Sequence, residues 1–103
     1  WAEYARCIAL PGTATAICED YRASATTDLV HDRADRLAGN SIRAPLRVLW
    51  GSQGAVGRCF NVLPLWQSVA TDVSGRSLDC GHYIAEESPE ALLEEMVAFF
   101  QTR

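Results

Sequence analysis

Two short β-rich runs with a helical stretch between them constrain the fold of this chain more than any other feature. The first run is LRVLW, residues 46–50, which stops at Gly51, and the second lies near VSGRSLDC, residues 73–80. LPLWQSVATD, residues 63–72, predicts a helix between the two runs, and residues 88–103 predict a final helix. The order strand, helix, strand, helix is typical of parallel strands joined by a crossover.

The apolar stripe of the last helix predicts a partner surface larger than two strands. Ser88 and Pro89 suit the start of that helix, and its stripe consists of Leu92, Leu93, Met96, Val97, Phe99 and Phe100. A parallel sheet carries helices on both faces, and two strands cannot form such a sheet alone. Either the rest of the sheet lies outside these 103 residues, or copies of the chain associate to replace it; a start at Trp1 rather than Met fits a fragment.

The first 40 residues predict helices only. Apolar residues recur at helical spacing, Pro11-Gly12 ends the first helix, and Thr13 can cap the second. A third helix starts at Thr27 or Asp28, and Gly39-Asn40 ends it in a left-handed turn. GSQGAVGR, which follows LRVLW, contains three glycines and predicts a plain loop.

Composition argues against several classes of function. The net charge is −4 and the nine basic residues are scattered, which argues against a nucleic-acid partner. No apolar run approaches the roughly 20 residues that span a bilayer, so no membrane association is expected. The four cysteines, Cys7, Cys18, Cys59 and Cys80, form no C-x-x-C pair and have no His at ligand spacing, so no zinc site is expected. No other metal or cofactor is expected. Two disulfides are possible, but buried free thiols in a reducing cytoplasm are the favoured interpretation.

The strongest candidate for a site residue is His82, in DCGHYIAEESP at residues 79–89. It follows a glycine at the end of a predicted strand, and the carboxyl ends of parallel strands are where such folds place a general base. A structural histidine on the surface is the alternative interpretation.

Two other strings carry weaker signals. Tyr21, in CEDYRA, has a hydroxyl that can donate to an anion or a leaving group, although a packed tyrosine beside a solvated charged pair is the favoured interpretation of this string alone. Asp32, in HDRADR, lies within a helical stretch instead of at the sharp strand-to-helix turn that a carboxylate nucleophile needs. HDRADR therefore predicts a solvated helix face.

Together the strings CEDYRASA, HDRADRLAGNSIRAPLRVLWG and DCGHYIAEESPEALLEEMVAFF resemble the C-terminal third of haloacetate dehalogenases, fluoroacetate dehalogenase in particular. These enzymes have the α/β-hydrolase fold. The resemblance implies that residues 1–40 match the end of the helical cap domain and that residues 41–103 match the C-terminal βαβα part of the core.

The resemblance also implies a chemistry. In that family an Asp displaces the halide of a small haloacid to form an ester, and a His activates the water that hydrolyses it. His82 matches this catalytic base, and Tyr21 matches a cap tyrosine that binds the departing halide beside a His and a Trp. The Asp nucleophile belongs to the N-terminal part of the family, so the resemblance implies that the isolated 103 residues are inactive.

The loop after LRVLWG separates some alternatives. Many α/β hydrolases place the acid that orients the His in this loop, but here the loop carries Ser52, Gln53 and Gly54. The resemblance to dehalogenases implies this absence, because that family carries the acid after an earlier strand. Another α/β hydrolase, either an epoxide hydrolase or an esterase, stays open. So does a truncated, non-catalytic protein that self-associates, for example as a homodimer.

Overall fold

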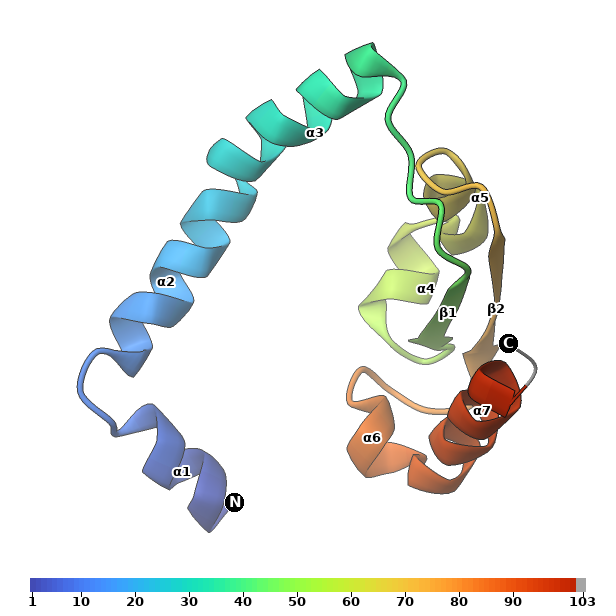
Figure 1. Cartoon of the computed structure of the whole chain (residues 1–103). Helices are drawn as coiled ribbons and strands as arrows, with labels where there is room; N and C mark the ends of the chain where they lie inside the picture. The colour runs from blue at the N-terminus through green and yellow to red at the C-terminus, as the bar shows by residue number, and fades with distance from the viewer. Residues whose placement is uncertain (102–103) are drawn as a thin grey trace. The chain divides into compact units, whose positions relative to one another are not determined.

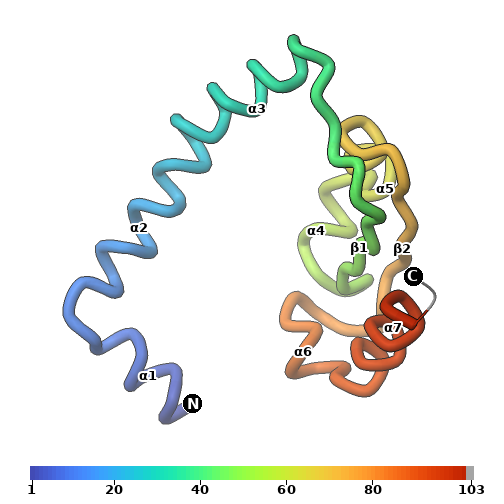
Figure 2. The backbone as a smooth tube through the Cα atoms, viewed as in Figure 1, coloured from blue at the N-terminus to red at the C-terminus, as the bar shows by residue number. Residues whose placement is uncertain are grey.

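The computed structural model describes residues 1–101, and the chain forms two compact units, Trp1–Asn40 and Ser41–Arg103. The first unit consists of α1 (Ala2–Ile8), α2 (Thr13–Ser24) and α3 (Thr27–Ala38), which follow one another along the chain in Figures 1 and 2. The second contains both strands and the remaining helices.

Glycines set the ends of the helices in the first unit. Gly12, with φ 85°, precedes α2 as its N-cap residue, so the prediction that Thr13 caps this helix is wrong: Thr13 is already helical. Gly39, with φ 70°, ends α3, and the N–H of Asn40 donates to the carbonyl of Asp35 at 2.9 Å. The predicted left-handed turn at Gly39-Asn40 is therefore confirmed.

The first unit has no core of its own. None of its described residues is buried, and Trp1 and Leu37 are 97% and 91% exposed. Short helices are marginal in water unless an apolar face is packed. Burial of apolar side chains therefore contributes little to the stability of these helices in this structure.

In the second unit, β1 (Leu46–Gly51) and β2 (Val73–Leu78) pair in parallel, as predicted. Leu46 lies opposite Val73, and Gly51 lies opposite Leu78. An isolated bridge between Ile42 and Ala70 extends the pairing before the strands. The carboxyl ends of both strands therefore meet at one edge.

The helices of this unit differ in part from the sequence prediction. The crossover contains α4 (Ala55–Cys59) and α5 (Val62–Gln67), followed after β2 by α6 (Ile84–Glu87) and α7 (Pro89–Gln101). The prediction that GSQGAVGR is a plain loop is wrong for the residues that form α4. A Cβ on Gly57 would lie 3.1 Å from the Trp50 ring, so this glycine lets the short helix approach β1. No helix in residues 1–101 has the length and apolar character needed to cross a membrane.

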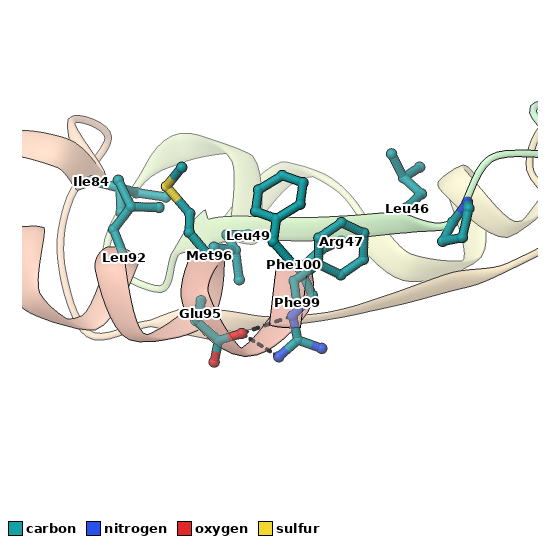
Figure 3. Close-up of a pocket in the computed structure, with 10 residues that line it drawn as sticks. Leu46, Arg47, Leu49, Ile84, Leu92, Glu95, Met96, Phe99 and Phe100 are labelled. Atoms are coloured by element: carbon teal, nitrogen blue, oxygen red, sulfur yellow. Dashed lines mark hydrogen bonds and ion pairs between the residues drawn. The ribbon is translucent and has the colours of Figure 1, made fainter. Parts of the chain in front are cut away.

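Helices lie on both faces of the strand pair (Figures 1 and 3). Trp50 faces α4, and Gly75 approaches Leu63 of α5. On the other face, Leu49 lines a cavity with α7. The buried apolar residues of this small core are Val48, Val62, Ala70, Leu78 and Cys80.

Glu95 joins α7 to both strands. The Nε of Arg47 in β1 donates to one carboxylate oxygen of Glu95 at 2.8 Å. The Nε of Arg76 in β2 donates to the other oxygen at 2.5 Å. Figure 3 shows the pair with Arg47. Glu95 is only 8% exposed, and the hydrogen bonds from Arg76 and Arg47 hold the pKa of its carboxyl below the ordinary value of 4.5.

Replacing Glu95 by Gln is expected to lower the free energy of unfolding by about 2–3 kcal/mol. The substitution removes the charge that two guanidinium groups share, although both arginines keep some contact with water. Chemical denaturation at pH 7 measures the change. The matched control is Glu94→Gln on the exposed side of the same helix, which is expected to change stability by less than about 0.5 kcal/mol.

The pH dependence of this stability difference tests whether the ion pairs of Glu95 are its cause. Because folding lowers the pKa of Glu95, its contribution is fully present above the unfolded value of 4.5 and is lost as the pH falls through the folded pKa. The stability difference between the wild type and Glu95→Gln should be constant near neutrality and shrink below pH 4.5. A difference that stays constant into acid would contradict the ion-pair explanation.

Candidate functional site

His82 lies in the loop that follows β2, where the carboxyl ends of the two strands meet. Two backbone hydrogen bonds join this loop to the one that follows β1. The N–H of Ser52 donates to the carbonyl of Leu78 at 2.8 Å, and the N–H of Gln53 donates to that of Cys80 at 3.0 Å. Ligand sites of parallel sheets lie at this edge.

Gly51 allows these two loops to approach each other. A Cβ at this position would overlap the carbonyl oxygen of Gly81 and lie 2.6 Å from that of Cys80. Only a residue without a side chain fits between β1 and the backbone that leads to His82. The backbone before His82 is therefore placed by its contact with the end of the neighbouring strand.

A small cavity of about 120 Å³ adjoins the histidine. Its lining residues are Leu49, Trp50, Gly51, Gly54, Val56, His82 and Ile84. His82 itself is exposed, and its ring meets that of Tyr83 edge to face, with centroids 5.3 Å apart. Among residues 1–101, no hydrogen bond or ion pair involves the imidazole, so both ring nitrogens are accessible to a water molecule or a further partner.

Glu87 holds the backbone on both sides of His82. One carboxylate oxygen accepts the N–H of Gly81 at 2.6 Å, and the other accepts the N–H of Tyr83 at 3.0 Å. The N–H groups of Glu86 and Glu87 donate to the carbonyl of Tyr83, each at 2.9 Å, and so close the short helix α6. The sequence string G-H-x-x-x-E-E-x-P contained this glutamate, but its spacing alone gave no role to the side chain.

The loop after β1 carries no carboxylate that could orient His82. Its Gln53 instead donates from Nε2 to Asp79 at 2.9 Å, which adds a side-chain bond between the two loops. In the described part of the chain, no carboxylate hydrogen-bonds the His82 ring. An acid that orients this histidine is therefore not supplied by residues 1–101.

The other predicted candidates lie in the first unit. Tyr21 is on α2 and 75% exposed, so its hydroxyl is accessible; a joint role with His82 stays a prediction. Asp32 is exposed within α3, at no strand-to-helix turn, in agreement with a solvated helix face.

The four cysteines are free in the structure. Only Cys80 is buried, and burial, aided by the charges of Glu87 and Asp79, raises the pKa of its thiol. The prediction of buried thiols is wrong for Cys7, Cys18 and Cys59, which are exposed, because the first unit has no core and Cys59 ends a surface helix. No group of three or more potential metal ligands occurs within residues 1–101.

Comparison with known proteins finds similar sequences and similar structures, but no family model. No protein-family model matches the chain. The soluble epoxide hydrolase of Corynebacterium sp. (strain C12) is 33% identical over 101 residues, which are 96% of this chain and 32% of that protein.

Two solved structures have nearly the same fold. A candidate acyltransferase from Salmonella enterica is 44% identical with a TM-score of 0.92, over 98% of this chain and 33% of that one. A candidate α/β hydrolase from Nostoc sp. PCC 7120 is 47% identical with a TM-score of 0.90, over 96% of this chain and 33% of that one. The chain thus spans about a third of the length of the proteins it matches.

Replacing Gly51 by Ala is expected to destabilise the second unit by about 3 kcal/mol, because the new methyl group overlaps the carbonyl of Gly81. Chemical denaturation measures the loss, and the backbone amide NMR shifts of Gly81 and His82 should change with it. Gly54→Ala is the control: its Cβ would come no closer than 3.3 Å to a neighbour, so a smaller loss is expected. Equal losses for the two variants would contradict the close approach at Gly51.

Proposed function

This chain has the fold of the C-terminal third of an α/β hydrolase, and we propose that it supplies the water-activating half of a haloacetate dehalogenase site. In this proposal His82 is the general base that hydrolyses a covalent ester. The nucleophilic carboxylate that forms the ester is supplied from outside this chain, and the substrate is a small haloacid.

The observation that carries the proposal is the placement of His82. An exposed imidazole follows β2 at the carboxyl edge of a parallel strand pair, and it borders a cavity. The loop is anchored by backbone bonds at Ser52 and Gln53 and by the carboxylate of Glu87. A rigid loop that presents one titratable ring to a cavity is what general-base catalysis requires.

The chemistry has two steps. In the first, a carboxylate oxygen attacks the carbon that bears the halogen, the carbon–halogen bond breaks, and the halide leaves with the electron pair. In the second, His82 takes a proton from water, and the hydroxide adds to the ester carbonyl. The tetrahedral intermediate collapses to a carboxylic acid and an alkoxide, and the alkoxide takes the proton back from the imidazolium and leaves as the hydroxy acid. The carboxylic acid then loses its proton to solvent, which restores the carboxylate.

Tyr21 has a role in the first step of this proposal. A neutral hydroxyl donates a hydrogen bond to the departing halide where negative charge develops, and this matters most for fluoride, a poor leaving group. Its exposure on α2 leaves the hydroxyl available for such a contact. The loop after β1 carries Gln53, which donates a hydrogen bond to Asp79 of the loop after β2. A glutamine at this place supports an enzyme in which the acid that orients the histidine comes from another part of the protein.

The second candidate function is epoxide hydrolysis, which the soluble epoxide hydrolase from Corynebacterium favours. His82 has the same role in it, because opening of an epoxide by a carboxylate also leaves an ester that water must cleave. The two candidates differ in the first step: one releases a halide and the other releases nothing until the diol leaves.

The test uses the protein in which this chain is joined to its nucleophile-bearing part. With fluoroacetate, we expect steady fluoride release, and His82→Ala is expected to release about one fluoride per enzyme and then slow by about 10³-fold. Mass spectrometry should detect the trapped ester on that variant. His31→Ala changes the only other histidine, on α3, and should leave turnover unaltered.

Three further results would decide between the candidate functions. A diol from an epoxide without fluoride from fluoroacetate would replace the first candidate by the second. Steady turnover in His82→Ala would overturn the role of the histidine in both. The isolated 103 residues should release no fluoride above background, because they contain the base without a nucleophile.

A non-catalytic alternative keeps one specific observation in its favour. Large apolar side chains of α7 are exposed, among them Leu93 at 61% and Phe100 at 67%. If copies of the chain cover these faces, the isolated chain is a homodimer at micromolar concentration, and light scattering would report twice its 11.3 kDa mass. A monomer at that concentration would argue against self-association.

A further inference from the structure

We propose that Glu87 is a positioning residue for the general base: its carboxylate fixes the backbone turn that presents His82. The inference rests on the proposed function, since it assigns Glu87 to the ester-hydrolysis step that His82 performs. The geometry of the turn, however, can be tested without any substrate.

The carboxylate binds the turn at two points that bracket the histidine. Its two oxygens accept the N–H groups of Gly81 and Tyr83, at 2.6 and 3.0 Å. Between these two nitrogens the backbone has only the φ and ψ rotations of Gly81 and His82. A planar carboxylate that holds both nitrogens therefore restricts all four rotations at once, and with them the direction of the His82 Cα–Cβ bond.

Gly81 is what allows this approach. A Cβ at this position would lie 2.6 and 2.8 Å from the two carboxylate oxygens of Glu87. A side chain here would push the carboxylate away from the N–H groups that it binds. The glycine, the histidine and the second glutamate of the string G-H-x-x-x-E-E-x-P thus act as one structural unit.

The first part of the loop is held independently. The carbonyls of Leu78 and Cys80 accept hydrogen bonds from Ser52 and Gln53 of the loop after β1. Glu87 holds the part of the loop that these bonds do not reach, which includes the backbone of the exposed His82. Loss of the carboxylate should therefore free the His82 backbone without unfolding the strand pair.

The chain offers a matched control beside Glu87. The side chain of Glu86 takes part in no hydrogen bond or ion pair among residues 1–101, although its backbone N–H donates to Tyr83. Glu86 and Glu87 lie on the same helix turn, and both are exposed glutamates. Any effect that is specific to Glu87 therefore comes from its contacts and not from charge at this end of the molecule.

The first experiment measures amide hydrogen exchange by NMR on the full chain. In Glu87→Ala, the amides of Gly81 and Tyr83 should exchange at least about 10-fold faster, since both lose their acceptor. In Glu86→Ala they should exchange as in the wild type. The amide of Leu92, bonded to Ser88 in α7, reports whether the fold is retained.

The second experiment measures kinetics on the protein that includes the nucleophile-bearing part. Glu87→Gln keeps one acceptor oxygen but turns an NH₂ group toward the other N–H, so it should weaken the turn without a cavity. We expect hydrolysis of the ester to slow by about 10- to 100-fold, while kcat/KM, which reports formation of the ester, keeps its wild-type value. Glu86→Gln should alter neither.

The outcomes separate the two proposals. Unchanged exchange at Gly81 and Tyr83 in Glu87→Ala would overturn the positioning role, as would faster exchange with wild-type ester hydrolysis in Glu87→Gln. Failure of the proposed function would appear differently. In that case His82→Ala would keep full turnover, while the exchange effect of Glu87→Ala would persist.

Discussion

One buried carboxylate connects the elements on which the rest of the second unit depends. Glu95 of α7 binds one arginine from each strand, so β1, β2 and the last helix meet at a single ion-pair cluster. Burial of a lone carboxylate is costly, and two guanidinium groups compensate for that cost. Arg47 and Arg76 keep side-chain exposures of 27% and 53%, so the excess positive charge stays hydrated. The cluster thus fixes α7 against the sheet in a unit that has only a small apolar core.

The histidine turn inherits its position from this arrangement. Glu87 ends α6, and only Ser88 separates it from Pro89, which begins α7. A fixed last helix therefore also fixes the carboxylate that binds Gly81 and Tyr83. From the other side, the contact at Gly51 places the same loop against the end of β1. The site is therefore positioned by backbone contacts and polar bonds more than by apolar packing, which explains how an exposed ring is held at a defined place.

The elements that the sequence predicted correctly are those whose formation depends on residues close together in the chain. The β-rich runs of β1 and β2, the left-handed end of α3 at Gly39 and the start of the last helix at Pro89 all depend on neighbouring residues. The position of His82 after a strand was found for the same reason. The short helices α4 and α6 were missed, because five and four residues hold too few turns for a helical period to appear. The bond from Arg47 to Glu95 spans 48 positions, and no spacing rule in the sequence connects such residues.

In the proposed function, the step assigned to His82 does not by itself choose between a haloacetate and an epoxide. Both give an ester that water cleaves, and a tyrosine hydroxyl such as that of Tyr21 can donate either to a halide or to an epoxide oxygen. The substrates differ in charge, since a haloacetate carries a carboxylate that needs a cationic partner. The cavity beside His82 is lined by Leu49, Trp50, Val56 and Ile84 together with two glycines, and no Lys or Arg of residues 1–101 is among its lining residues. In a haloacetate enzyme, the cation that binds the substrate carboxylate therefore comes from outside this cavity, whereas an epoxide hydrolase needs no such group. In the proposed function, substrate choice is thus decided at the carbon under attack, and the histidine turn supplies the ester hydrolysis that both candidate reactions share.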